Sequence, residues 1–91
     1  MRKAVEAVSK RGALLVCSAG NVEGGPVGFP AAYAPAVAVT ASTPLDTFYL
    51  FSSRGPEVGL IAPGTEIPTT ALGGGVTVRS GTSLAAPHVS A

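Results

Sequence analysis

An unbroken apolar run at residues 13–17 constrains the fold of this chain more than any other feature of its sequence. The run reads Ala-Leu-Leu-Val-Cys, which is of strand length and has no polar alternation. Such a run is typical of a strand that is covered on both faces in a parallel sheet. The apolar residues of 2–9 follow helical spacing, and Gly12 stands where a helix C-cap glycine would. Helix, tight turn and buried strand form half of a βαβ unit, which indicates an α/β fold.

The rest of the chain predicts further strands separated by loops. Residues 20–35 contain several glycines and prolines, which are typical of an irregular loop at the strand edge where α/β sheets bind ligands. The other expected elements are buried strands at 36–41 and 58–62, a surface crossover at 46–55, a hairpin of 67–71 and 76–79, and a helix within 81–91.

The apolar composition suits a larger domain than 91 residues can build. Hydrophobic residues make up 46% of the chain and charged residues 12%. A chain of this size buries only about 60 to 65% of its unfolded surface, so its own core would be thin. No C-cap signal follows Ala91, so we expect the last helix to continue in a longer parent chain. These observations predict a fragment of a larger domain.

The charge pattern excludes several classes of partner. Six Lys and Arg residues against five Asp and Glu residues give a net charge of +1, without the basic surface that binds nucleic acid. No apolar run reaches the roughly 18 residues that span a membrane. Charged residues interrupt residues 2–11, so we expect no signal peptide in this chain.

The single cysteine, Cys17, excludes an internal disulfide and is interpreted as an inert core thiol.

Ser83 is the first candidate for chemistry. It follows Gly81 and Thr82 and precedes small residues, so it would lie at the amino terminus of a helix. Backbone N–H groups and the helix dipole favour a developing anion there. On helix physics alone, Ser83 could be either a nucleophile or a capping residue.

Residues 81–89 read Gly-Thr-Ser-Leu-Ala-Ala-Pro-His-Val, which closely resembles the nucleophile motif of subtilisin-like serine proteases. Residues 18–21 (Ser-Ala-Gly-Asn) resemble the oxyanion-hole segment of that family, and residues 28–31 resemble its pocket loop. Residues 51–56 and 61–64 resemble its connecting segments. The resemblance implies that residues 1–91 are the carboxy-terminal part of a subtilase (peptidase S8) catalytic domain, with a three-layer fold and a mostly parallel sheet, and that this part is truncated at both ends.

The resemblance also implies roles for single residues. Ser83 would be the acyl-forming nucleophile of a serine endopeptidase, and the Asn21 side-chain amide with the Ser83 backbone N–H would bind the oxyanion. Small residues would line the pocket for a large hydrophobic side chain of a polypeptide substrate; they are Ser18, Ala19, Gly20 and Gly28. The family resemblance further implies secretion of the full-length protein.

Three smaller expectations follow from the same resemblance. The Phe29-Pro30 bond is a candidate cis peptide. A weak calcium or monovalent cation site could use the carbonyls of Ala31, Tyr33 and Ala36, although no acidic, histidine or cysteine cluster has metal-ligand spacing and no cofactor is expected. Leu84 stands where many relatives have an oxidation-sensitive methionine.

The general base and its acid partner are not evident in the sequence. His88 follows Ser83 by five helical positions, which rotates it by about 140° and moves it about 7.5 Å along the axis, so it is interpreted as structural. Asp46, the only aspartate, is expected in a surface turn. The resemblance places the missing pair in the remainder of the catalytic domain, so this chain alone is expected to be inactive. Two alternatives stay open: a non-catalytic remnant that binds peptide or a partner chain, and complementation by a second chain that carries Asp and His.

Overall fold

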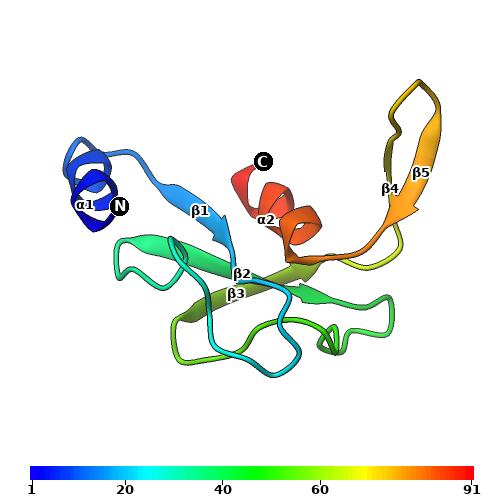
Figure 1. Cartoon of the computed structure of the whole chain (residues 1–91), viewed down its shortest axis with the longest axis horizontal. Coiled ribbons are helices and arrows are strands. Elements are labelled where there is room, and N and C mark those ends of the chain that lie inside the picture. Colours follow the sequence, from blue (N-terminus) through cyan, green and yellow to red (C-terminus); the bar gives the residue numbers. More distant parts are fainter.

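The computed structural model describes residues 1–91 and contains two helices and five strands (Figure 1). Both helices are nine residues long, and neither is long and apolar enough to cross a membrane. In chain order the elements are α1 (Arg2–Lys10), β1 (Leu15–Ser18), β2 (Ala36–Ser42), β3 (Val58–Pro63), β4 (Ile67–Thr70), β5 (Val76–Arg79) and α2 (Thr82–Ser90).

The three strands of the main sheet run parallel in the order β1-β2-β3. Parallel strands need a crossover between them, which the loops 19–35 and 43–57 provide. The α/β class and its parallel sheet are therefore confirmed. Gly12, with φ +86°, follows the last turn of α1 as the predicted C-cap glycine.

The prediction of a fully covered first strand is wrong for this chain. β1 begins at Leu15 instead of residue 13, all four of its residues are only half-buried, and Leu14 is exposed. The physical reason is that β1 forms the edge of the sheet, so none of the described residues pairs with its outer side. The buried strand is instead the central β2, in which residues 38–41 are buried. β3 is also less buried than predicted, because it forms the opposite edge.

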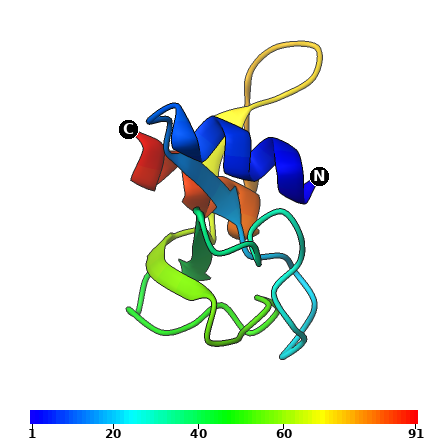
Figure 2. The same cartoon turned by 90° about the vertical axis from the view of Figure 1, so that its left-hand side faces the viewer.

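The two faces of the sheet have different covers (Figures 1 and 2). Helix α2 packs across all three strands, and Ala85 joins Val39, Ala41 and Ala62 in one buried cluster. The opposite face carries a second cluster, formed by Ala38 with residues of the loop 19–35. Helix α1 lies beside that loop. The sheet is thus a middle layer between α2 and this loop, and each side is held by small apolar side chains.

Gly64 directly follows β3 and contacts the residues at which α2 begins. Its N–H donates to the Ser42 carbonyl at 3.2 Å, and its own carbonyl accepts from the Gly81 N–H at 2.7 Å. A Cβ at this position would lie 2.5 Å from the Ala41 Cβ, 2.8 Å from the Gly81 oxygen and 3.1 Å from the Ala85 Cβ. Only glycine allows this approach, which fixes where α2 begins relative to the sheet.

The β4–β5 hairpin projects away from the body of the molecule (Figure 1). Its strands pair antiparallel over four positions, and the three glycines of its turn, 73–75, all have positive φ, as the predicted loose turn requires. The predicted crossover also forms on the surface, except that Ser52 and Ser53 are fully buried.

Candidate catalytic site

The site is assembled where β1 ends and α2 begins. Asn21 follows β1, and Ser83 is the second residue of α2. The N-cap of α2 is Gly81, whose φ of +152° allows the sharp entry of the chain into the helix. Ser83 is exposed in the first turn of α2, where the helix dipole favours negative charge.

Thr82 fixes the orientation of the Asn21 amide. The Asn21 Oδ1 accepts hydrogen bonds from the Thr82 N–H at 2.8 Å and from the Thr82 hydroxyl at 2.9 Å. The Thr82 Oγ1 in turn accepts from the Gly20 N–H at 3.1 Å. The two hydrogen bonds from Thr82 to Asn21 both end on the amide oxygen, so the amide nitrogen, Nδ2, is left free to donate. Thr82 is fully buried and therefore holds two segments together that lie 61 positions apart.

The Asn21 amide nitrogen and the Ser83 hydroxyl flank the same point beside Gly81. A Cβ on Gly81 would lie 3.4 Å from the Asn21 Nδ2 and 3.6 Å from the Ser83 Oγ. A donor and a hydroxyl that lie this close to one position can engage an electrophilic carbonyl and the oxygen that becomes negative when it is attacked. The structure therefore brings the two sequence-predicted catalytic residues together.

Ser53 supports the other side of the same segment. Its N–H donates to the Gly20 carbonyl at 2.8 Å, and its Oγ accepts from the Val22 N–H at 3.2 Å. Gly20 has φ +114°, and a Cβ there would lie 2.9 Å from the Ser53 Oγ, so this position requires glycine. The sequence analysis passed over Ser53 and Thr82. Two features of the sequence could have indicated them: Thr82 is a polar residue directly before the predicted nucleophile, and Ser53 belongs to a pair of serines inside the predicted crossover.

A hollow of about 750 Å³ opens beside Ser83. Of the four predicted pocket residues, only Ser18 lines it. The Ala19 side chain is fully buried in the core, and the Gly28 N–H donates to the Ala19 carbonyl at 3.0 Å, which ties the two predicted segments together. Phe29 and Pro30, joined by the predicted cis peptide bond, also form part of the wall. The remaining lining residues are Val16, Cys17, Ala86, Pro87, Ser90 and Ala91.

His88 and Asp46 lie as the sequence analysis predicted. The His88 Nδ1 is 2.9 Å from the Leu84 carbonyl of its own helix, and the ring is exposed. Because a carbonyl only accepts hydrogen bonds, Nδ1 carries the proton in this arrangement. Asp46 occupies a turn with φ +58°, and its N–H donates to the Thr43 carbonyl at 3.0 Å. His88 is thus engaged with its own helix, and Asp46 belongs to a surface turn.

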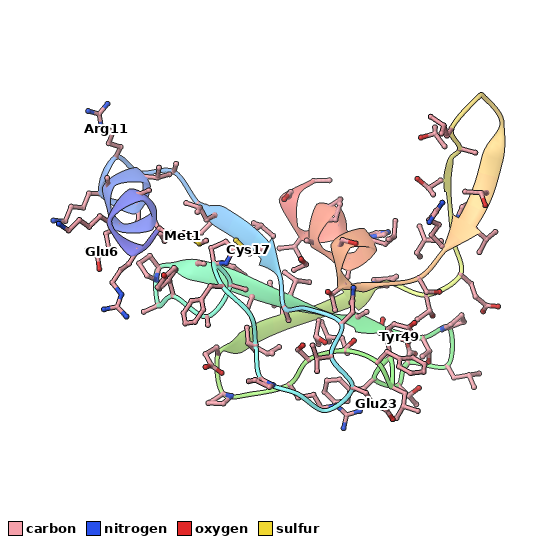
Figure 3. All side chains as sticks on the ribbon, viewed as in Figure 1. Met1, Glu6, Arg11, Cys17, Glu23 and Tyr49 are labelled. Atoms are coloured by element: carbon pink, nitrogen blue, oxygen red, sulfur yellow. The ribbon has the colours of Figure 1, made fainter.

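Cys17 borders the hollow from β1 (Figure 3). Burial raises the pKa of its thiol, which keeps it protonated and agrees with an unreactive residue. The side chain is half-buried instead of buried, because β1 is an edge strand. The structure brings no group of three or more His, Cys, Asp or Glu side chains together. Cation binding by the carbonyls of Ala31, Tyr33 and Ala36 stays a prediction.

The sequence of this chain is similar to those of known proteins. The model of the family described as "Subtilase family" matches residues 1–91. The chain belongs to the subtilase family. Alkaline elastase YaB of Bacillus sp. (strain YaB) is 40% identical over 89 residues, which are 98% of this chain and 24% of the relative. Minor extracellular protease Epr of Bacillus subtilis (strain 168) is 42% identical over 92 residues, which cover 100% of this chain and 14% of the relative.

The subtilase fold is shared with solved structures. The prenylagaramide maturation protease PagA superposes with a TM-score of 0.91 at 32% identity, over 97% of this chain and 33% of that one. The chain therefore spans about a quarter or less of the two curated relatives and about a third of the solved structure. The family and fold expected from residues 18–21 and 81–89 are confirmed.

Proposed function

We propose that this subtilase chain carries the nucleophile and the oxyanion donors of a serine endopeptidase. The observation that supports the proposal best is the double hydrogen bond from Thr82 to the Asn21 Oδ1, which leaves the Asn21 Nδ2 free beside Ser83. A donor that is fixed before the substrate arrives needs no reorganisation when charge develops. Such preorganisation separates a catalytic arrangement from a serine that only caps a helix.

In the proposed reaction the Ser83 Oγ attacks the carbonyl carbon of the scissile peptide bond. The carbonyl oxygen becomes an oxyanion that accepts hydrogen bonds from the Asn21 Nδ2 and the Ser83 N–H. The amine then leaves with a proton, and water hydrolyses the acyl-enzyme ester on Ser83. The attack of Ser83 and of water requires a general base, and the departure of the amine requires the same group in its protonated form as general acid, within about 2.6 to 3.2 Å of the transferred proton.

Neither ionisable candidate of this chain supplies that base. The His88 Nδ1 is bonded to the Leu84 carbonyl, and Asp46 lies in a surface turn. We therefore place the base and its acid partner in the remainder of the catalytic domain, because the chain spans only 24% of alkaline elastase YaB. The same domain would cover the free edge of β1.

The proposed substrate is a polypeptide. Part of the wall of the hollow beside Ser83 is apolar, including Phe29 and Pro30, and this part suits a large hydrophobic side chain next to the scissile bond. Family membership supports this class of substrate. An extracellular location is proposed as well, supported by the name of the Epr relative. A weak cation site near Tyr33 remains part of the proposal.

One observation favours a second candidate, a non-catalytic chain that binds a peptide or a partner. The outer edge of β1 is unpaired, and its backbone could add an extended strand beside the hollow. This alternative needs neither Ser83 nor a base, so the two functions make different predictions for a serine variant.

The test compares the chain alone with a hybrid in which residues 1–91 replace the matched segment of alkaline elastase YaB. We expect the chain alone to leave a chromogenic peptide intact and the hybrid to hydrolyse it. Ser83→Ala should abolish hydrolysis by the hybrid while leaving its thermal melting unchanged. Ser9→Ala, in α1 and outside the hollow, is the matched control and should keep full activity.

Two results would count against the proposal. Ser83-dependent hydrolysis by the chain alone would show that the base lies within residues 1–91. A hybrid that melts cooperatively yet hydrolyses nothing would contradict a catalytic role for Ser83. Binding of the peptide by the chain alone, equally tight in Ser83→Ala, would then favour the non-catalytic alternative.

A further inference from the structure

A second cavity, of about 320 Å³, lies between the central strand β2 and the loop that leads to β3. It shares no lining residue with the hollow beside Ser83. Its volume is at the small end of the range for ligand pockets, about 300 to 1,000 Å³. The lining residues are Thr40, Phe48, Ser53, Arg54, Gly55 and Val58.

Thr40, in the wall of this cavity, has an unsatisfied hydroxyl. The residue is only 1% exposed, and its Oγ1 has no hydrogen-bond partner. Buried hydroxyls in folded proteins are paired in the large majority of cases, because an unpaired one destabilises the fold. Thr40 lies in the middle of the buried part of β2, where an alanine or valine would be the ordinary residue. An unpaired hydroxyl here is explained if a bound group pairs with it.

Ser53 adds a second hydroxyl to the same wall. It is 1% exposed, and its Oγ accepts from the Val22 N–H at 3.2 Å. That bond uses an acceptor site of the oxygen, while the hydroxyl proton makes no hydrogen bond within the chain. Thr40 and Ser53 therefore offer two O–H donors to the cavity.

Arg54 brings a positive charge to the cavity mouth. Its guanidinium carbon lies 5.4 Å from the centre of the Phe48 ring, and no carboxylate oxygen lies within 4.0 Å of its nitrogens. Stacking over an aromatic ring occupies one face of the guanidinium and leaves its N–H edge free for a bidentate carboxylate. Glu57, the nearest acidic residue in the sequence, lines two other hollows, and one of its carboxylate oxygens would lie 2.6 Å from a Cβ on Gly55.

From this arrangement we infer that the cavity binds a small monocarboxylate. The guanidinium of Arg54 and the hydroxyls of Thr40 and Ser53 supply donors, which match the acceptor-only carboxylate group. The side chains of Phe48 and Val58 supply an apolar wall for a short aliphatic tail. The lining of the cavity includes no acidic side chain that would bind a cation, and a fully apolar ligand would leave both hydroxyl protons without an acceptor. The inference does not depend on the proposed protease function.

The position of Ser53 gives the site a physical connection to the oxyanion segment. The same residue holds the Gly20 carbonyl and the Val22 N–H, on either side of Asn21. A carboxylate that accepts the Ser53 hydroxyl proton therefore changes the partners of a residue that supports Asn21. Binding is expected to shift the amide resonance of Val22 together with those of the cavity wall.

The experiment is a titration of the ¹⁵N-labelled protein with sodium propionate, followed by amide resonances. Sodium chloride at equal ionic strength and neutral propionamide serve as ligand controls. We expect saturable shifts at Thr40, Ser53, Arg54 and Val22 with propionate alone. Arg54→Gln should weaken binding about tenfold or more, because it removes the charged donor. Arg79→Gln, an exposed arginine on β5, is the matched control and should bind as the unchanged protein does.

A variant of the buried hydroxyl completes the test. Thr40→Val should weaken propionate binding about fivefold, whereas Thr40→Ser, which keeps the hydroxyl, should restore it. If Thr40→Val does not fold, the Arg54 and Arg79 pair still decides the question. Equal shifts with chloride or propionamide, or equal loss in both arginine variants, would overturn the inference. Unchanged binding in Arg54→Gln would overturn it as well.

Discussion

The junction formed by Gly20, Asn21, Gly64, Gly81 and Thr82 differs from the β4–β5 hairpin in how its chain segments are held. At the junction, a buried threonine makes hydrogen bonds to two residues that lie more than 60 positions away. The hairpin is held by its own ladder, and Leu72, Val76 and Val78 are largely exposed. The junction is therefore fixed by tertiary contacts, and the hairpin by local pairing.

This difference indicates where the sequence is under the strictest physical constraint. Glycines at the junction are packed against other atoms, so they cannot gain a side chain without moving the backbone. Glycines at the hairpin tip have positive φ yet face open space. The same residue type thus serves close approach in one region and chain reversal in the other.

The largest expected effect is that of Gly64→Ala, which tests the close approach directly. The added methyl group would meet the Ala41 Cβ and the Gly81 oxygen, so we expect a loss of about 3 kcal/mol in the free energy of unfolding. Gly74→Ala in the hairpin meets no atom within 4 Å and should cost about 1 kcal/mol, from its φ of +102° alone. Urea unfolding of both variants measures the difference. Equal losses would show that the junction is no more constrained than the hairpin.

Thr82→Val is expected to have the next largest effect. Valine keeps the shape of the side chain but leaves the Gly20 N–H without its partner and removes one of the two bonds to Asn21. The expected loss is about 2 kcal/mol in the free energy of unfolding. Thr77→Val on β5 makes the same chemical change on a half-buried strand of the hairpin and should stay within about 0.5 kcal/mol. A Thr82 variant as stable as the Thr77 variant would remove the basis of the comparison.

The smallest effect concerns Cys17 on the open edge of the sheet. Burial raises the pKa of its thiol in the folded state above the value in the unfolded chain. The folded state therefore holds this proton more tightly, and the stabilisation is complete below the ordinary thiol pKa of about 8.5. As the pH rises through the window above that value, the free energy of unfolding should decrease. Urea midpoints compared between the protein and Cys17→Ala isolate this slope, and identical slopes would contradict it.

Local patterns predicted most of the fold. The apolar runs and the glycine triplet located all five strands to within two residues, because strand length and turn chemistry are encoded locally. Burial was predicted less well. The composition of β1 is that of a covered strand, but whether a strand is covered depends on neighbours that its own residues do not specify.

For the candidate site, too, some residues were found from the sequence and others were missed. Ser83 and Asn21 were found through motifs, and the structure brings them together around Gly81. The supporting residues Thr82 and Ser53 were missed, because their hydrogen bonds cross 62 and 31 positions of sequence. Of the predicted pocket residues, Ser18 lines the hollow beside Ser83 and Ala19 does not, and their role in substrate binding stays a prediction. Ala19 faces the core, since it is the first residue after β1 and its side chain points to the loop-covered face of the sheet.

The central claim is that the Asn21 amide is a fixed oxyanion donor, and Asn21→Asp in the hybrid catalytic domain tests it most directly. Aspartate keeps an oxygen to accept from Thr82 but has no Nδ2 to donate, and its negative charge also repels the oxyanion. In subtilisin, the loss of the corresponding donor is known to decrease kcat by about 10² to 10³. We predict a decrease of at least about 10² in kcat, a small change in KM and an unchanged melting temperature. An unchanged kcat would contradict the account.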